Sequence, residues 1–164
     1  MSPQDDRESQ AGAAVTDALS VAEELCHAHG VKLTQSRRLI LEILANEGRP
    51  LGAYDMIEKV AAATGKSPAP VTIYRALDFL LENGLVHRLA SRNAYLACGH
   101  GHRVQDLVVF LICESCGHVV EATSDALRQD LASLAAKTRF VPHSQVMEIA
   151  GRCQACGAAE VASA

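Results

Sequence analysis

The segment Ile112-Cys113-Glu114-Ser115-Cys116-Gly117 contains a Cys-x-x-Cys pair followed by glycine, and Cys153-Gln154-Ala155-Cys156-Gly157 repeats the pattern. Two thiolates spaced three residues apart can hold one metal ion from one side, and the glycine after them tolerates a tight turn. Two such pairs supply the four sulfur ligands of a closed tetrahedral zinc site. Residues 117–152 between them can form a strand, a helix and a returning strand. The spacing therefore predicts a small α+β module held together by zinc.

Two disulfides or four inert thiols are the alternative interpretation of these cysteine pairs. Residues 1–12 are polar and acidic and lack the apolar segment of a secretion signal, so we expect a cytoplasmic protein. In a reducing compartment paired cysteines bind metal more often than they form disulfides. No apolar run approaches the roughly 20 residues that a membrane helix needs, and we expect no membrane partner.

Charge is unevenly distributed along the 164 residues, whose net charge is −4. Residues 32–92 contain nine Lys or Arg and six Asp or Glu, a net charge of +3. The rest of the chain has six against thirteen, a net charge of −7. A basic block beside an acidic block predicts two modules with different partners, and nucleic acid suits the basic one.

The first module is predicted to be a winged-helix domain over residues 16–97, preceded by a flexible tail over residues 1–15. Hydrophobic periodicity and helix stop signals predict four helices, over residues 16–29, 34–47, 53–63 and 70–82. A hairpin follows, with strands over residues 85–89 and 94–97 joined by a polar turn. Helices followed by a β-hairpin are the order of a winged helix.

The second module is predicted to span residues 107–164, after a hinge rich in glycine and histidine over residues 98–106. Strands are expected over residues 107–112, 119–121 and 144–150, with a helix from Ser124 to about Lys137. The first and last of these strands each lead into a cysteine pair. The fold class is therefore α+β, with a helical module followed by a small α/β module.

The predicted helix from Pro70 suggests how the basic module meets a partner. Its core side is expected to include Val71 and Leu77. Thr72, Tyr74 and Arg75 near its N-terminus suit the major groove of DNA, because arginine can bind guanine bidentately and the helix N-terminus favours phosphate. A solvated helix face is an equally simple interpretation of this helix alone. The basic residues that precede and follow it favour DNA; they are Arg37, Arg38, Arg88 and Arg92.

Three segments of this sequence resemble the ferric uptake regulator family: residues 30–38, 70–77 and 112–117. Residues 52–55 and 76–88 are similar to its zinc uptake regulator branch. The resemblance covers about residues 17–157. Val109-Phe110 stands where iron-sensing members have a histidine cluster.

The resemblance implies a homodimeric, metal-responsive repressor that binds palindromic operator DNA. It implies an N-terminal winged-helix DNA-binding domain and a C-terminal α/β dimerisation domain that carries the four-cysteine structural zinc. An exchangeable zinc between the domains would license DNA binding. The candidate DNA-binding residues are Tyr54, Thr72, Tyr74, Arg75, Lys66, Arg37 and Arg92.

His87, Cys98 and Glu121 match the ligand positions of the regulatory zinc in the zinc branch. One nitrogen, one sulfur and one oxygen ligand suit zinc better than calcium or magnesium. The fourth ligand is left open. His100 or His102 is favoured for zinc, and Asp106 is the alternative. His143 matches a histidine of a further metal site in some members, but Arg128 replaces its usual carboxylate partner.

The function predicted from these observations is zinc-responsive transcriptional repression. The first alternative is a related sensor of iron, manganese or peroxide, which the sulfur ligand disfavours. An enzyme is not expected, because four thiolates leave no open coordination position and no histidine is followed two places later by glutamate, as zinc deaminases require. No small-molecule substrate is expected. A zinc-stapled interaction module that does not bind DNA is the third possibility.

Overall fold

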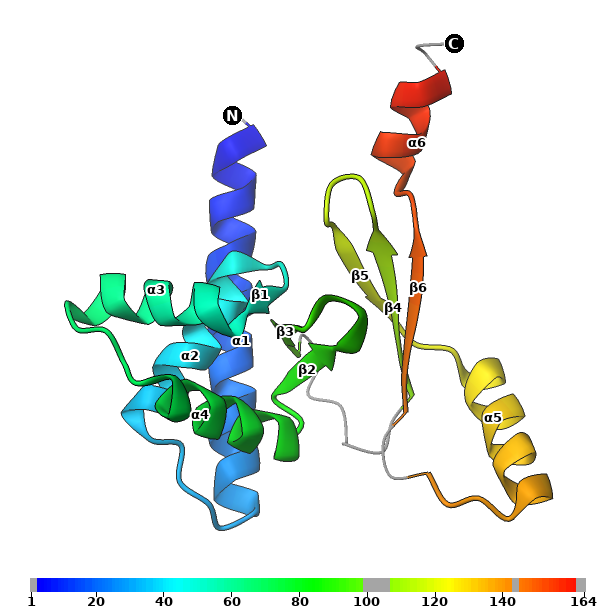
Figure 1. Ribbon diagram of the computed structural model, residues 1–164, viewed down its shortest axis with the longest axis horizontal. Helices are drawn as coiled ribbons and strands as arrows, with labels where there is room; N and C mark the ends of the chain where they lie inside the picture. Colours follow the sequence, from blue (N-terminus) through cyan, green and yellow to red (C-terminus); the bar gives the residue numbers. More distant parts are fainter. Residues whose placement is uncertain (1–2, 99–106, 143–144, 162–164) are drawn as a thin grey trace. The chain divides into compact units, whose positions relative to one another are not determined.

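A computed structural model of the protein describes residues 3–98, 107–142 and 145–161. The chain forms two compact units, Met1–Val104 and Gln105–Ala164. The division between them falls inside the segment predicted to be a hinge. Each unit contains its own three-stranded sheet (Figure 1).

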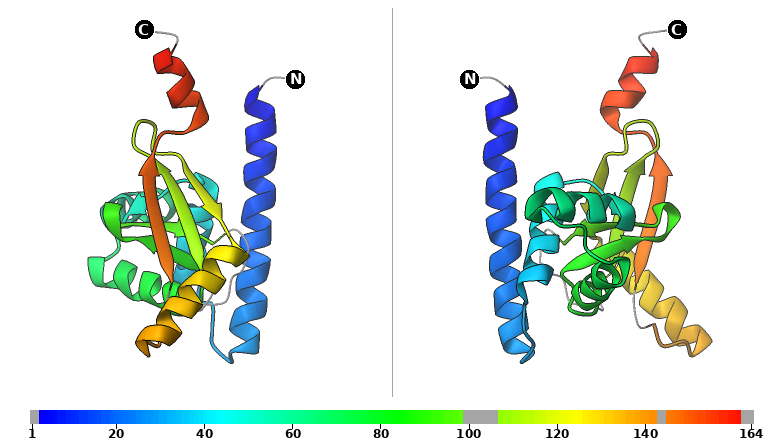
Figure 2. Two further views of the ribbon diagram at one scale, coloured as in Figure 1. Left: turned by 90° about the vertical axis from the view of Figure 1, so that its right-hand side faces the viewer. Right: turned by 60° about the vertical axis from the view of Figure 1, so that its left-hand side comes forward.

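Unit 1 is built on four helices. They are α1 (Pro3–Ala28), α2 (Gln35–Glu47), α3 (Ala53–Thr64) and α4 (Pro70–Glu82). Residues 3–15, which the sequence predicted to be part of a flexible tail, belong to α1, which runs without interruption through residues 3–28 (Figure 2). Seven of the thirteen residues 3–15 are Gln, Glu, Arg or Ala, which favour the helix.

Local sequence signals set the ends of these helices. Pro70 occupies the first turn of α4, where a missing amide hydrogen costs nothing. Gly65 ends α3 with φ +72°, and its amide donates to the carbonyl of Ala61 at 2.8 Å. Only glycine adopts this left-handed conformation at no steric cost. The end of α3 and the start of α4, the helix that carries the predicted DNA contacts, are therefore set by local sequence.

The core of unit 1 lies where α2, α3 and α4 face one another. Leu44, Met56, Leu77 and Leu80 are all at most 1% exposed. Val71 does not belong to this core, contrary to the prediction, because 55% of its surface is exposed. A residue in the first turn of α4 lies at the edge of the helix layer, where helical periodicity alone does not ensure burial.

A small sheet completes unit 1, with strand order β1-β3-β2. Its strands are β1 (Leu51–Gly52), β2 (Val86–Leu89) and β3 (Ala94–Ala97). The predicted hairpin is β2 and β3, joined by the 3₁₀ turn η1 (Ala90–Arg92) and by Asn93, which has φ +47°. The two-residue β1, which pairs Leu51 with Tyr95, is too short to leave a sequence pattern.

Unit 2 is a sheet in which β4 (Val108–Cys113) lies between β5 (Val119–Ala122) and β6 (Val146–Gly151) (Figure 2). Strand β4 pairs antiparallel with β5 and parallel with β6. Helix α5 (Asp125–Thr138) connects β5 to β6, as predicted, and the Ser124 hydroxyl accepts a hydrogen bond from the Leu127 amide at 3.3 Å. The C-terminal helix α6 (Gln154–Val161) was not predicted.

Two truncations on α4 test this description of the core. Leu77→Ala should lower the free energy of unfolding of unit 1 by about 2–5 kcal/mol, because it leaves a cavity among buried side chains. Val71→Ala should change it by less than about 0.5 kcal/mol, because that side chain is largely exposed. Urea unfolding monitored by tyrosine fluorescence reports on unit 1, since Tyr54, Tyr74 and Tyr95 are the only tyrosines of the chain. Equal losses in the two variants would contradict the assigned orientation of α4.

Candidate metal centre and nucleic-acid interface

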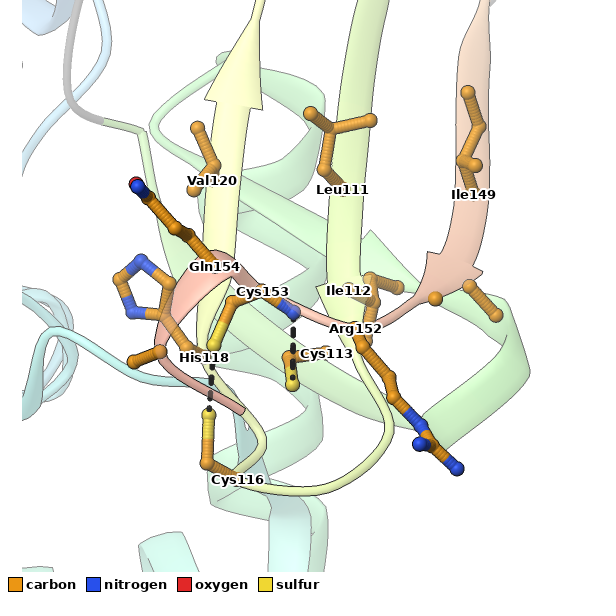
Figure 3. Close-up of a pocket in the computed structure, with 13 residues that line it drawn as sticks. Leu111, Ile112, Cys113, Cys116, His118, Val120, Ile149, Arg152, Cys153 and Gln154 are labelled. Carbon is orange, nitrogen blue, oxygen red and sulfur yellow. Dashed lines mark hydrogen bonds between the residues drawn. The ribbon is translucent and has the colours of Figure 1, made fainter. Parts of the chain in front are cut away.

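The parallel pairing of β4 with β6 brings the two cysteine pairs to the same end of the sheet. Cys113 is the last residue of β4 and lies opposite Gly151, the last residue of β6. The chain then continues from β4 into Cys116 and from β6 into Cys153 (Figure 3). Segments about 40 residues apart in sequence therefore converge because parallel strands end at the same edge.

The four sulfur atoms of Cys113, Cys116, Cys153 and Cys156 all lie within 4.8 Å of one another. The Sγ atoms of Cys116 and Cys153 are 3.7 Å apart. A tetrahedral zinc ion with Zn–S bonds of about 2.3 Å separates its sulfurs by about 3.8 Å. None of the six cysteines is in a disulfide, and 3.7 Å is far longer than an S–S bond. The arrangement fits a four-thiolate zinc site.

The local electrostatics differ between the sulfurs of this cluster. The amide of Cys153 donates to the Cys113 sulfur at 3.4 Å. With the amides of Cys116 and Ser115, it lowers the pKa of Cys113 to about 6, because these donors stabilise the thiolate. Hydrogen bonds with the side chains of Cys153, Cys116 and Cys113 raise the pKa of Cys156 to about 12. The backbone amides thus favour the thiolate form of Cys113, which is the form in which cysteine binds metal.

The two glycines that follow the cysteine pairs have different roles. Gly117 has φ +75°, and its amide donates to the Cys113 carbonyl at 3.0 Å, which closes the predicted tight turn. Gly157 lies inside α6, where its amide donates to the Cys153 carbonyl at 2.9 Å. The expectation of a turn glycine in both pairs was therefore wrong for the second pair, whose geometry is set by the helix.

Helix α4 divides into a buried face and an exposed face. Ile73, Ala76, Leu77 and Leu80 are buried. The exposed positions have the helical spacing i, i+3, i+4 and i+7, and they are Val71, Tyr74, Arg75 and Asp78. Thr72 is also exposed. The helix therefore offers the predicted Thr, Tyr and Arg side chains to solvent near its N-terminus.

Two cations and an aromatic residue extend this exposed surface. Lys66 and Arg75 are exposed, and neither forms an ion pair within the described part of the chain. Tyr54, in the first turn of α3, has 78% of its surface exposed. Uncompensated cations near a helix N-terminus suit a polyanionic partner.

Arg37 is held by contacts within unit 1. Its guanidinium lies 3.5 Å from the centre of the Phe79 ring and donates to the Lys32 carbonyl at 2.7 Å. Phe79 is on α4, so this cation–π contact ties α2 to the helix that carries the predicted DNA contacts. Arg37 thus has a positioning role in addition to the predicted one. In the hairpin, Arg92 is exposed on η1, and Arg88 donates to the Asn93 side chain at 3.0 Å.

The orientation of α4 follows from its core contacts. Ile73, Leu77 and Leu80 fix the buried face, and the cation–π contact of Arg37 with Phe79 limits rotation of the helix against α2. Once the core face is fixed, helical geometry determines which side chains face outward. The chemistry that α4 offers to a partner is thus a consequence of core packing.

Two of the three predicted regulatory ligands lie close together within unit 1. His87 on β2 pairs with Leu96, and the Cys98 amide donates to the Leu85 carbonyl at 3.0 Å. The register makes His87 and Cys98 diagonal neighbours on one face of the hairpin, a distance that side chains can span. His87 is half-buried and Cys98 is 5% exposed. In unit 2, Glu121 lies half-buried on β5, opposite Phe110.

Four further candidates lie outside the described residues: His100, His102, Asp106 and His143. Arg128, which occupies the expected position of a carboxylate partner for His143, forms an ion pair with Asp125 at 2.7 Å.

The exposure of Val71, on the same face of α4 as Tyr74 and Arg75, was not predicted from the sequence. Its position directly after Pro70, in the first turn, was the only available signal.

The thiolate chemistry of the four-cysteine site predicts how it loses zinc. Transfer of zinc to a chromophoric chelator should become faster as the pH falls from 8 to 6, because protons compete with zinc for the four thiolates. Cys113→Ser should abolish retention of zinc and unfold unit 2, since a structural zinc contributes on the order of 10 kcal/mol to folding. Cys26→Ser, on α1, is the matched control and should retain zinc. A release rate independent of pH, or a folded Cys113→Ser protein, would contradict the assignment.

Comparisons with known proteins agree with this geometry. The zinc uptake regulation protein of Escherichia coli K12 is 34% identical over 140 residues, which are 85% of this chain and 81% of that protein. The peroxide operon regulator of Bacillus subtilis is 32% identical over 149 residues, 87% of this chain and 95% of that protein.

Among solved structures, a zinc uptake regulator complexed with zinc and DNA matches with a TM-score of 0.82 and 33% identity, over 90% of this chain and 97% of that chain. The structure of holo XcZur matches with a TM-score of 0.77 and 38% identity, over 85% of this chain and 96% of that chain. The family model of the ferric uptake regulators matches residues 28–150. The chain belongs to the ferric uptake regulator family.

Proposed function

We propose that this protein is a zinc-responsive transcriptional repressor that binds palindromic operator DNA as a homodimer in the cytoplasm. The observation that carries the proposal is the exposed face of α4, which presents Thr72, Tyr74 and Arg75 on a helix whose other face is core. The likeness of 90% of the chain to a zinc uptake regulator complexed with zinc and DNA supports it. None of the described helices has the length and apolar character of a membrane span.

The DNA contacts are proposed to divide into two kinds. Arg75 and Tyr74 on α4 would reach base edges in the major groove, where arginine recognises guanine bidentately. Lys66, before α4, and Tyr54, on α3, would contact phosphates and fix the orientation of the helix. Thr72 is suited to either contact. Arg92 on the hairpin is suited to the flanking backbone, as the basic wing of a winged helix would be.

The four-cysteine cluster is proposed to be a structural zinc site. Its sulfur separations fit a tetrahedral ion, and four protein ligands leave no position open for a substrate or water. A closed site of this kind supplies folding free energy to a small sheet. We therefore propose a regulatory and not a catalytic role for the protein.

A second, regulatory zinc is proposed at His87 and Cys98 of unit 1 with Glu121 of unit 2. The diagonal placement of His87 and Cys98 on one hairpin face supports the first two ligands. The combination of imidazole, thiolate and carboxylate suits zinc and disfavours manganese or magnesium. The fourth ligand is proposed to be His100 or His102, with Asp106 as the alternative.

Unit 2 is proposed to dimerise. Leu111, Val120 and Ile149 lie in register across β4, β5 and β6, and each is 43–47% exposed. An apolar row of this kind on a three-stranded sheet is suited to contact with a second protein surface. Two copies of unit 1 could then meet successive major grooves about 34 Å apart, as palindromic operators require.

The DNA-binding proposal is tested at Arg75. Arg75→Ala should weaken operator binding by roughly 1–3 kcal/mol and relax the preference at one base pair of each half-site. Arg75→Lys keeps the positive charge but loses the bidentate guanidinium group. It should therefore bind nonspecific DNA more tightly than Arg75→Ala, while its base preference stays relaxed. Fluorescence anisotropy with an operator selected from a random pool measures both. Unchanged affinity and preference in Arg75→Ala would place recognition elsewhere.

The regulatory site is tested at Cys98. Cys98→Ser should leave a folded dimer that retains the structural zinc but needs at least tenfold more free zinc for operator binding, because one of about four ligands is weakened. Cys26→Ser is the matched control, since Cys26 is equally buried in unit 1 and is not a proposed ligand. Operator titrations at buffered free zinc, with metal analysis, measure the shift. If Cys98→Ser responds at the wild-type zinc concentration, the regulatory site does not include Cys98.

A further inference from the structure

Val71 is the one aliphatic side chain on the exposed face of α4, and the proposed contacts do not explain its exposure. It is 55% exposed, whereas Ile73 and Leu77 on the same helix are at most 1% exposed. Valine is also a poorer helix former than alanine, because its branched side chain loses rotamer freedom. Neither burial nor helix propensity therefore favours a valine at this position.

The position of Val71 relates it to the residues proposed to recognise bases. Val71 precedes Tyr74 by three residues and Arg75 by four, so the three side chains share one face of α4, about one helical turn apart. Val71 also lies in the first turn, directly after Pro70. In helices that enter the major groove, the N-terminal residues contact the base edges. Val71 thus lies at the end of α4 that would reach deepest into the major groove.

The major groove presents one apolar group, the C5 methyl of thymine. An exposed branched aliphatic side chain beside polar base-reading residues has no hydrogen-bonding capacity, so its contribution to a DNA interface is limited to apolar contact. We propose, on the basis of the DNA-binding function proposed above, that Val71 recognises a thymine methyl group in each operator half-site. It is a specificity-determining residue that discriminates thymine from cytosine and from uracil.

The expected contribution of Val71 to base recognition differs in chemistry from those of Tyr74 and Arg75. Arg75 and Tyr74 can discriminate bases through donors and acceptors, and these are identical in thymine and uracil. Replacing thymine by deoxyuridine removes only the methyl group. Sensitivity to this replacement therefore reports on apolar contact and leaves the hydrogen bonds of the neighbouring residues intact.

The experiment starts with an operator that zinc-loaded wild-type protein selects from a random pool. Each thymine is then replaced in turn by deoxyuridine, and the Kd is measured by anisotropy at fixed salt and free zinc. Wild-type protein should lose roughly fourfold in affinity at one thymine of each half-site, the ratio that corresponds to one buried methyl group. Val71→Ala should lose a similar factor on the unmodified operator and should no longer distinguish thymine from uracil there.

Val31→Ala is the control, because it removes the same two methyl groups from another exposed valine of unit 1, outside α4. It should keep the discrimination. Wild-type protein that binds every uracil-substituted operator as tightly as the original overturns the proposal, and so does Val71→Ala protein that keeps the full discrimination. Selection that enriches no sequence overturns the DNA-binding function and, with it, this inference.

Discussion

The parallel pairing of β4 with β6 is the constraint on which unit 2 depends. Because the two strands run in the same direction, Cys113 and Gly151 end at the same edge, and both cysteine pairs leave the sheet together. An antiparallel arrangement would place the pairs at opposite ends. Zinc and the sheet therefore support each other: the strands position the sulfurs, and a bound ion would hold together a unit in which α5 has no buried residue.

Much of the fold was predictable from the sequence because its signals are local. Pro70 at the start and Asn83-Gly84 at the end bound α4 at Pro70–Glu82, the predicted range within the limits of helix assignment. The four-cysteine cluster was predictable because two Cys-x-x-Cys pairs in one chain are typical of a zinc site. The proposed regulatory ligands came from the family resemblance, and no spacing rule would have chosen His87 among seven histidines.

The features that sequence did not predict depend on long-range contacts or on the edges of elements. Strand β1 exists because Leu51 pairs with Tyr95, more than 40 residues away, and two residues carry no periodicity. A turn like the one after the first cysteine pair was expected at the second pair, but helix α6 begins there, at Gln154. The exposure of Val71 depends on how far the core extends beneath the first turn of α4, which hydrophobic periodicity does not specify.

The chemistry of the two proposed zinc sites explains why they would have separate roles. Four thiolates around one ion leave no open position, and loss of that ion would cost unit 2 much of its folding free energy, so its occupancy cannot follow small changes in available zinc. The proposed regulatory site has mixed nitrogen, sulfur and oxygen ligands and shares none of them with the four-cysteine cluster. Because Cys98 follows β3 and lies outside that cluster, loss of an ion from the proposed site would remove no ligand from the structural one. Reversible response to zinc therefore requires the regulatory ligands to be distinct from the structural ones.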